Sequence, residues 1–209
     1  MSSATPPKYL VLDSETSGLF DFTKAADAPG QPRLASVALL YVDHLMQVHG
    51  ELNFLCTPDG WEVSEEAAKV NGLTTEHLRQ HGKPVAQVLD VYAAAIEAGY
   101  IVATYNAQFD TKIMRAELRH AGRPDLFEKT PNICLMRACT DLVKVPKKTG
   151  KGWKFPKLGE ACAFFKIEQP AAHSAMGDAI SALEILRHLH KANLVPAAEV
   201  HFAKEKPAQ

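Results

Sequence analysis

Short apolar runs separated by loop residues dominate the first quarter of the chain. Residues 9–12 are apolar and end abruptly at Asp13, a pattern typical of a buried strand whose carboxyl end carries polar chemistry. Two longer apolar runs, 34–42 and 46–55, are separated by Asp43-His44, which indicates a hairpin. The sequence therefore begins with three predicted strands.

From residue 64 onward, apolar positions recur at helical spacing, interrupted by single short strands. Residues 84–98, for example, place Val85, Val88, Leu89 and Tyr92 on one face of an amphipathic helix that Gly99 ends. The same signals predict helices at 64–71, from Thr74 or Thr75, at 106–120, 158–165 and 174–191, and strands at 100–104 and 133–135. This order predicts an α/β fold, with one mixed five-stranded sheet flanked by helices.

Composition and charge narrow the class of protein only slightly. The formal net charge is −1, so any attraction to nucleic acid must be local. The four cysteines form no C-x-x-C pair, which favours free thiols in a reducing compartment. No apolar run approaches the length of a membrane span, and we expect a cytoplasmic protein without a membrane partner.

Acidic residues follow two of the predicted strands. Asp13 and Glu15 are two apart on a strand, so their side chains leave the same face, although D-x-E also occurs by chance in loops. Asn106 and Asp110 are four apart and share the face of a helix at its first turn. Taken alone, this second pair is better interpreted as a helix cap, with Asn106 capping and Asp110 favouring the positive helix end.

A third polar group precedes the last helix. His173 is expected on the loop, Ser174 as the helix cap and Asp178 in the first turns. Alone, this pattern also fits an exposed surface histidine. Together, however, the three groups supply four carboxylates, about the number that a pair of hard cations such as Mg²⁺ or Mn²⁺ requires. Imidazole changes protonation near neutral pH, which suits removal of a proton from an attacking water.

The combination resembles the DEDDh family of 3′→5′ exonucleases, which includes the proofreading subunit of bacterial replicative polymerase and ribonuclease T. Three motifs carry the resemblance in family order, and a helical element lies between the first two. These are Asp13-Ser14-Glu15-Thr16-Ser17-Gly18-Leu19, Val70-Asn71-Gly72-Leu73-Thr74, Asn106-Ala107-Gln108-Phe109-Asp110 and His173 to Asp178. The resemblance covers about residues 8–190, so we expect a flexible N-terminus at 1–7, an exonuclease domain at 8–195 and a polar C-terminal tail at 196–209.

The resemblance implies a ribonuclease H-like fold and a role for each motif residue. Asp13 would bridge two divalent ions, Mg²⁺ or Mn²⁺, and Glu15 and Asp178 would complete the site that holds the attacking water. Asp110 would serve the second ion and His173 would be the general base. The remaining implied contacts support the site or lie near the terminal nucleotide: Thr16, Leu19, Asn71, Asn106 and Phe109.

Two positions depart from the family pattern. Tyr105 and Asn71 stand where many relatives carry histidine. Neither position is a metal ligand in the family, so the departures concern contacts near the terminal nucleotide and the preference for a substrate.

A lysine-rich segment lies between the second and third motifs. Its lysines are interleaved with Trp153 and Phe155, and no acid interrupts them. Lysines neutralise phosphates and aromatic rings stack on bases, so Lys151, Trp153 and Lys154 are candidate substrate contacts, although such charge runs are often only solvated loops. The lysines are Lys144, Lys147, Lys148, Lys151, Lys154 and Lys157.

The leading hypothesis is a stand-alone 3′→5′ exonuclease acting on a single-stranded 3′ end, with DNA favoured. The alternatives are a proofreading subunit that docks to a DNA polymerase, an RNA-trimming exoribonuclease, and a binding module without catalysis. The sequence indicates no polymerase partner, and the resemblance includes relatives that are homodimers.

Overall fold

A mixed five-stranded sheet forms the middle of three layers in the computed structural model, which describes residues 8–126, 130–170 and 173–199. Its strand order is β3-β2-β1-β4-β5, with β1 antiparallel to β2, β2 antiparallel to β3, and β4 parallel to both β1 and β5. This confirms the predicted sheet. The strands are β1 (Lys8–Thr16), β2 (Leu34–Val42), β3 (Val48–Leu55), β4 (Tyr100–Thr104) and β5 (Asn132–Cys134).

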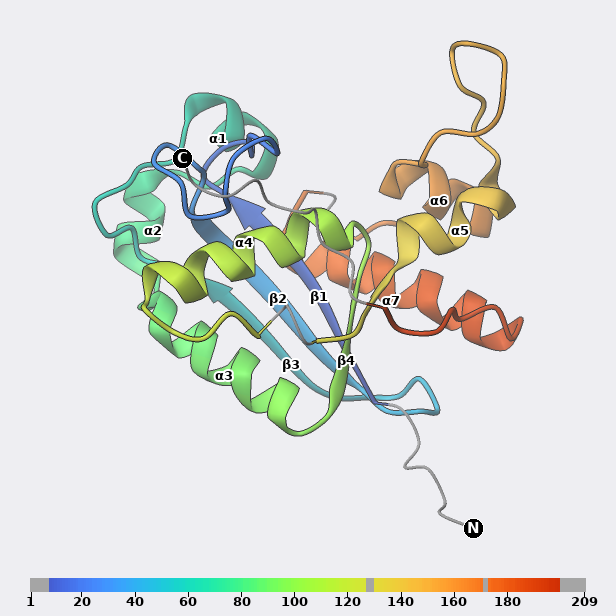
Figure 1. Cartoon of the computed structure of the whole chain (residues 1–209), viewed down its shortest axis with the longest axis horizontal. Helices are drawn as coiled ribbons and strands as arrows, with labels where there is room; N and C mark the ends of the chain where they lie inside the picture. The colour runs from blue at the N-terminus through green and yellow to red at the C-terminus, as the bar shows by residue number, and fades with distance from the viewer. Residues whose placement is uncertain (1–7, 127–129, 171–172, 200–209) are drawn as a thin grey trace.

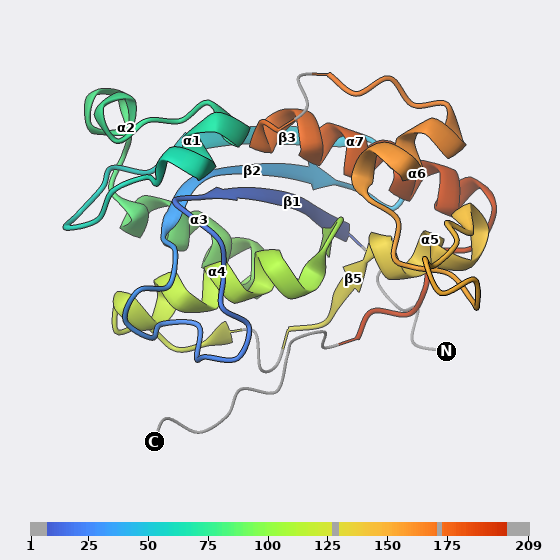
Figure 2. The same cartoon turned by 90° about the horizontal axis from the view of Figure 1, so that it is seen from above.

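Helices cover both faces of the sheet (Figures 1 and 2). The helices α3 and α4 lie on one face, and α7, with α5 and α6 beside it, covers the other. The helices are α1 (Glu65–Asn71), α2 (Thr75–His81), α3 (Val85–Glu97), α4 (Ala107–His120), α5 (Leu135–Val143), α6 (Leu158–Phe165) and α7 (Ala175–Lys191).

Alternation along β1 assigns its side chains to two separate cores. Leu10 and Leu12 pack in the cluster that includes residues of α3 and α4, whereas Tyr9 and Val11 pack in the cluster that includes residues of α7. Because successive side chains of a strand point to opposite faces, Asp13 continues the α7 side. The same alternation sends Ser14 to the α4 side.

Two elements differ from the sequence prediction. The strand β1 extends to Thr16, beyond the apolar run 9–12, and it includes Asp13 and Glu15, which their spacing had placed on a strand. Leu135 begins the helix α5, which the sequence pattern did not predict, and β5 ends at Cys134. The apolar positions of α5, Leu135, Met136, Cys139, Leu142 and Val143, do recur at helical spacing, but the helix follows β5 directly and has no side-chain cap, so no start signal separates it from the strand.

Most of the residues at both ends of the chain lie outside the residues that the structure describes. The predicted flexible segment 1–7 and residues 200–209 of the predicted tail lie outside the described residues. Within the described part, Glu199 pairs with Asn132 through two backbone hydrogen bonds, of 2.7 and 2.9 Å. The four cysteines are buried free thiols, as predicted. Among the described helices, none combines the length and apolar character that crossing a bilayer requires.

A buried ion pair closes the loop between β1 and β2. The carboxylate of Glu117, on α4, accepts from Arg33 Nε and Nη2, both at 2.8 Å, and from the Leu34 N–H at 2.9 Å. Arg33 in turn exchanges two hydrogen bonds with Ser17, one through its N–H and one through its carbonyl. These bonds hold both ends of the loop 17–33 against the sheet.

Replacing Glu117 by alanine should destabilise the protein markedly. Removing one partner of a buried pair costs about 3–5 kcal/mol, and the Arg33 side chain keeps 21% of its exposure, so we expect a loss of about 2–3 kcal/mol in the free energy of unfolding. Urea denaturation measures it. Asp90→Ala, which breaks the exposed pair with Arg123, is the matched control and should cost at most about 1 kcal/mol. Equal losses in the two variants would contradict the role given to Glu117.

Candidate active site

Three carboxylates converge at the carboxyl end of β1. Asp13, Glu15 and Asp178 each offer a carboxylate oxygen, and these oxygens all lie within 4.8 Å of one another. The first two leave the same face of β1 because they are two residues apart. The third comes from the first turn of α7, which covers that face.

A tight turn before α7 delivers Asp178. His173 has a positive φ of 64°, and Ser174 follows as the helix cap, accepting a hydrogen bond from the Gly177 N–H at 3.2 Å. This is the predicted arrangement of loop, cap and first turn. The side chain of His173 is exposed, and the backbone hydrogen bond and the charge of His173 partly offset the rise that burial causes in the pKa of Asp178. The structure thus brings the predicted base next to the acidic group.

Asp110 reaches the site from the opposite face of the sheet. The helix α4 follows β4, which runs parallel to β1, and Asp110 lies buried in its first turn. Its Oδ1 accepts hydrogen bonds from the Ser14 N–H at 3.1 Å and from the Ser14 hydroxyl at 2.7 Å. Asn106 occupies the N-cap position, but its side chain makes no capping hydrogen bond, so the capping interpretation was wrong.

Burial raises the pKa of every acid in this group. Burial is the largest cause at each position. The charges of the neighbouring acids add to it at Asp13, whose pKa lies well above its ordinary value, and at Glu15, whose pKa rises to about 7 although Asn71 opposes the rise. Hydrogen bonds from Ser14 limit the rise in the pKa of Asp110.

The oxygen atoms present fit a hard divalent cation. Asp178 Oδ1 is buried, yet no group among the described residues donates a hydrogen bond to it. Carboxylates forced together in this way repel one another unless a cation lies between them. Oxygen donors are also the ligands that Mg²⁺ and Mn²⁺ prefer. Asp13, Glu15 and Asp178 are therefore the residues that would hold such an ion.

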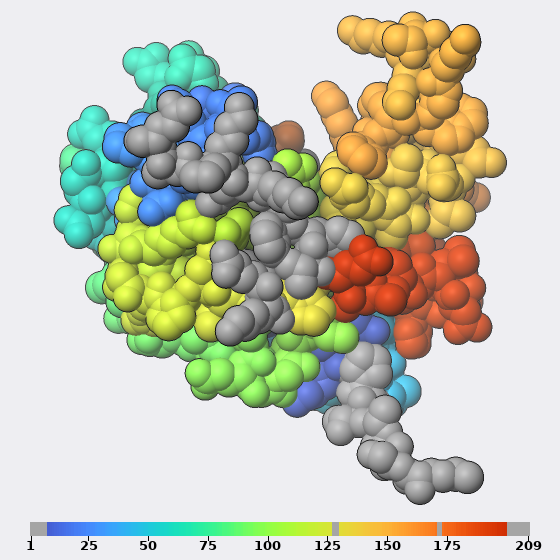
Figure 3. Space-filling view, in the orientation of Figure 1, coloured from blue at the N-terminus to red at the C-terminus, as the bar shows by residue number. Residues whose placement is uncertain are grey.

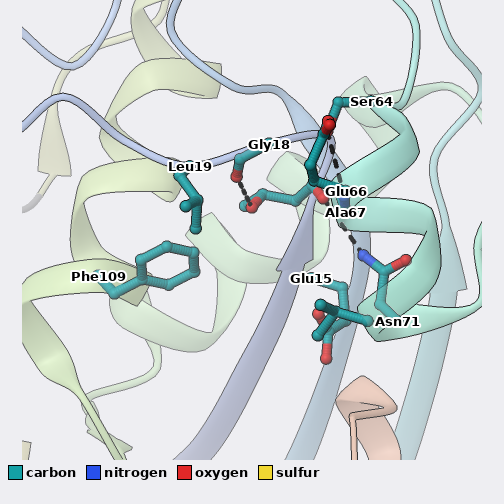
Figure 4. A pocket seen from close by; sticks show the side chains of 10 residues that line it. Glu15, Gly18, Leu19, Ser64, Glu66, Ala67, Asn71 and Phe109 are labelled. Carbon is teal, nitrogen blue, oxygen red and sulfur yellow. Dashed lines mark hydrogen bonds between the residues drawn. The ribbon is translucent and has the colours of Figure 1, made fainter.

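A pocket of about 210 Å³ adjoins the acids (Figure 4). Glu15 lies at its base, Leu19 and Phe109 form one wall, and Asn71 of α1 faces them. The Leu19 side chain is 90% exposed, which leaves it available to a ligand. Thr16 also lines the pocket, and its hydroxyl donates to the Gly18 carbonyl at 2.7 Å. The structure thus gathers four of the predicted substrate contacts around one cavity.

Other predicted site residues lie away from this pocket. Lys151, Trp153 and Lys154 belong to a hairpin between α5 and α6 that projects from the body of the protein (Figure 1). The space-filling view shows a hollow between this side and the side that carries loop 17–33 and α1 (Figure 3). The lysine-rich segment therefore lines a groove rather than the pocket itself.

Sequence reasoning missed Ser14 and most of the helical wall of the pocket. Ser14 is the variable position of the D-x-E motif, and only strand alternation, which sends it towards α4, marks it as the partner of Asp110. Ala67 carries no chemical signal in the sequence, Ser64 marks only the start of α1, and Val70 belongs to the helical motif but was given no role.

The chain is similar to known exonucleases in family and in structure. A family model described as exonuclease matches residues 10–186. No curated protein sequence matches the chain. In structure, the chain is similar to exonuclease I of E. coli in complex with a dT13 oligonucleotide, with a TM-score of 0.72 and 20% identity over 90% of this chain and 42% of the other.

Two further structures of exonuclease I are similar to the chain to the same degree. The zinc-bound form of its complex with single-stranded DNA has a TM-score of 0.73, 20% identity and the same two coverages, 90% and 42%. The apo enzyme gives 0.71 and 18%, over 91% of this chain and 44% of the other. The chain thus spans less than half the length of these proteins, and it shares their ribonuclease H-like fold, as predicted.

The acidic group predicts how the stability of the metal-free protein depends on pH. Glu15 has an ordinary pKa of 4.5 in the unfolded chain and about 7 in the folded protein, so between these values the folded state alone retains the proton. Stability should therefore be full below pH 4.5 and fall as pH rises to about 7, by at most about 1.4 kcal/mol per pH unit for each such carboxyl.

Thermal unfolding across this pH range, with chelator and with Mg²⁺, measures the effect. Glu15→Gln should flatten the decline, because glutamine does not titrate. Mg²⁺ should raise the melting temperature more at high than at low pH, since bound metal requires the ionised carboxylates. A stability profile that rises from pH 4.5 to 7 in chelator would be incompatible with the repulsion described above.

Ser14→Ala should impair the site without unfolding the protein. The variant removes the hydroxyl that donates to Asp110 Oδ1 and keeps the backbone N–H. Loss of a group that orients a metal ligand costs about 10–100-fold in metal affinity or activity. We expect nuclease activity to fall by about tenfold and the Mg²⁺ concentration for half-maximal activity to rise.

The matched control is Ser181→Ala, which removes another buried hydroxyl, one that donates to the Gly177 carbonyl. It should leave the metal requirement unchanged. An unaltered Mg²⁺ requirement in Ser14→Ala would show that Asp110 does not depend on this hydroxyl.

Proposed function

Because the chain belongs to the exonuclease family whose model matches residues 10–186, we propose that it removes single nucleotides from the 3′ end of single-stranded DNA. The proposal rests on one observation: the acids adjoin a pocket of limited size, which Glu15 helps to line. A pocket of about 210 Å³ beside the acids, with α1 on one side, suits one terminal nucleotide better than a continuing strand. This geometry favours removal from an end over cleavage within a strand.

The pocket residues would hold the terminal nucleotide. The ring of Phe109 offers a stacking surface for its base, and Leu19 covers it from solvent. Asn71 donates to the Thr16 carbonyl at 3.3 Å, which ties α1 to the end of β1 and fixes the width of the pocket. These contacts are apolar or involve backbone, so they support binding of different bases.

Two divalent ions, Mg²⁺ or Mn²⁺, are the cofactors that we propose for the acids. Asp13, Glu15, Asp110 and Asp178 would hold them, with Asp13 shared between the two. Such ions lower the pKa of a bound water, orient a phosphodiester and stabilise the leaving oxygen. Ser14 and Asn71 keep the carboxylates in place by hydrogen bonding.

His173 would act as the general base. Its exposed position on the loop before α7 puts the imidazole beside Asp178, where it can take the proton of the attacking water and release it to solvent.

A time course on matched 5′-labelled single-stranded DNA and RNA tests the proposal. We expect a ladder that shortens from the 3′ end, requires Mg²⁺ or Mn²⁺ and is faster on DNA. Asp13→Ala should abolish it, and His173→Ala should lower the rate by about 10²–10⁴-fold, the usual contribution of a general base.

His188→Ala is the matched histidine control. His188 lies near the end of α7, its Nδ1 bonded to the Glu184 carbonyl at 2.8 Å, and its loss should not affect the rate. Faster shortening of RNA would identify an RNA-trimming enzyme instead. No cleavage of either strand with either metal would refute the enzymatic proposal.

Association with other chains stays a prediction from the family resemblance. Size-exclusion chromatography with light scattering would reveal a homodimer, and co-purification would reveal a polymerase partner.

A further inference from the structure

The lysine-rich segment forms an ordered hairpin on the rim of the groove. The Lys147 N–H donates to the Gly152 carbonyl at 3.1 Å, and the Lys154 N–H donates to the Val145 carbonyl at 2.9 Å. Pro146 and Trp153 pair between these bonds. We call residues 144–157 the lysine hairpin. Its backbone bonds hold the charged tip in a defined place instead of leaving it as a free loop.

Positive charge is concentrated on this hairpin. Its residues include six lysines and no acid, in a chain whose formal net charge is only −1. Lys154 is paired with Glu160 of α6, with both carboxylate oxygens within 2.8 Å, so it fixes the base of the hairpin rather than facing a ligand. The remaining five are exposed: Lys144, Lys147, Lys148, Lys151 and Lys157.

Two aromatic side chains accompany these charges. Trp153 is 42% exposed and Phe155 is 51% exposed, and being two residues apart on an extended segment they share one face. The guanidinium of Arg137, on α5, lies 5.3 Å from the centre of the Phe155 ring. Exposed large aromatic residues beside unpaired lysines are the combination that binds single strands, with bases stacked on the rings and phosphates near the ammonium groups.

The hairpin is attached directly to the catalytic side of the sheet. Tyr105 lies between β4 and α4, and its buried hydroxyl donates to the Pro156 carbonyl at 2.8 Å. The Met136 N–H of α5 donates to the Tyr105 carbonyl, also at 2.8 Å. Tyr105 thereby holds the base of the hairpin five residues in sequence from Asp110. Figure 3 shows the hairpin across the hollow from loop 17–33 and α1, which form the pocket.

We propose that the lysine hairpin binds the part of a single strand that leads into the pocket. The pocket takes the terminal nucleotide, so the nucleotides before it must leave through the groove, past the hairpin. There Lys148 and Lys151 would neutralise phosphates and Trp153 would stack on a base. The inference rests on the proposed function for the direction of the strand, whereas the binding itself does not require cleavage.

Binding measured in chelator separates the two proposals. Fluorescence anisotropy with labelled oligo(dT), titrated at several salt concentrations, reports affinity without any reaction. Removing two phosphate contacts should reduce the slope of log affinity against log salt by about 1.4, at about 0.7 for each contact on a single strand. We expect this change in Lys148→Ala/Lys151→Ala. Lys8→Ala/Lys191→Ala, at the opposite end of β1 and α7, is the matched control and should leave the slope unchanged.

Tryptophan fluorescence tests the stacking contact. The chain has two tryptophans, so Trp61→Phe leaves Trp153 as the sole reporter. Oligo(dT) should quench its emission, and Trp153→Ala should weaken binding of the long strand by roughly 5–100-fold. In cleavage assays, the loss of kcat/KM in the hairpin variants should be greater for a long strand than for a trinucleotide, because a trinucleotide has fewer phosphates outside the pocket to contact the hairpin.

Each outcome bears on one proposal. An unchanged salt slope in Lys148→Ala/Lys151→Ala, or the absence of quenching of Trp153, would overturn the role of the hairpin even if the protein cleaves DNA. Salt-dependent binding through the hairpin without cleavage would uphold this inference and refute the proposed exonuclease reaction. Equal losses on the trinucleotide and the long strand would show that the hairpin acts on the pocket, not on the approaching strand.

Discussion

Repulsion among the carboxylates at the end of β1 is the constraint around which the rest of the site is arranged. Burial and neighbouring negative charge raise the pKa of Asp13 and Glu15 together. Carboxylates this close together destabilise the metal-free folded protein and attract a cation. Other interactions must therefore hold them in place. The surrounding hydrogen bonds and the two packed cores do so.

The acids reach the site from both faces of the sheet, so that hydrogen bonds from either side can hold them in place. One strand carries Asp13 and Glu15 towards α7 and Ser14 towards α4. The hydrogen bonds of Ser14 to Asp110 therefore link the two helical layers through the strand that carries the other acids. Because β1 and β4 run parallel, the start of α4 lies at the same edge of the sheet, and a single edge holds the whole group.

No lysine in the described part of the chain is among the groups that shift the pKa of the site acids. The lysine hairpin stands on the rim of the groove, and its Lys154 is paired with Glu160. Lysines inserted among the acids would lower their pKa but compete with a cation. Separation of the two charges allows a polyanion to be attracted to the rim while its end meets a site suited to metal ions.

By itself, the sequence determined the sheet, most of the helices and the candidate site residues Asp13, Glu15, Asp110 and Asp178, because hydrophobic periodicity and motifs of a few residues are local properties. It failed at α5, which follows β5 directly without a side-chain cap that would mark the start of a helix. Only the tertiary structure decided that Ser14 holds Asp110, that Lys154 is paired and that Tyr105 supports the hairpin. Each of these is a contact between residues on different elements. The residue pattern within one segment does not indicate which residues of another segment it will contact in the folded protein.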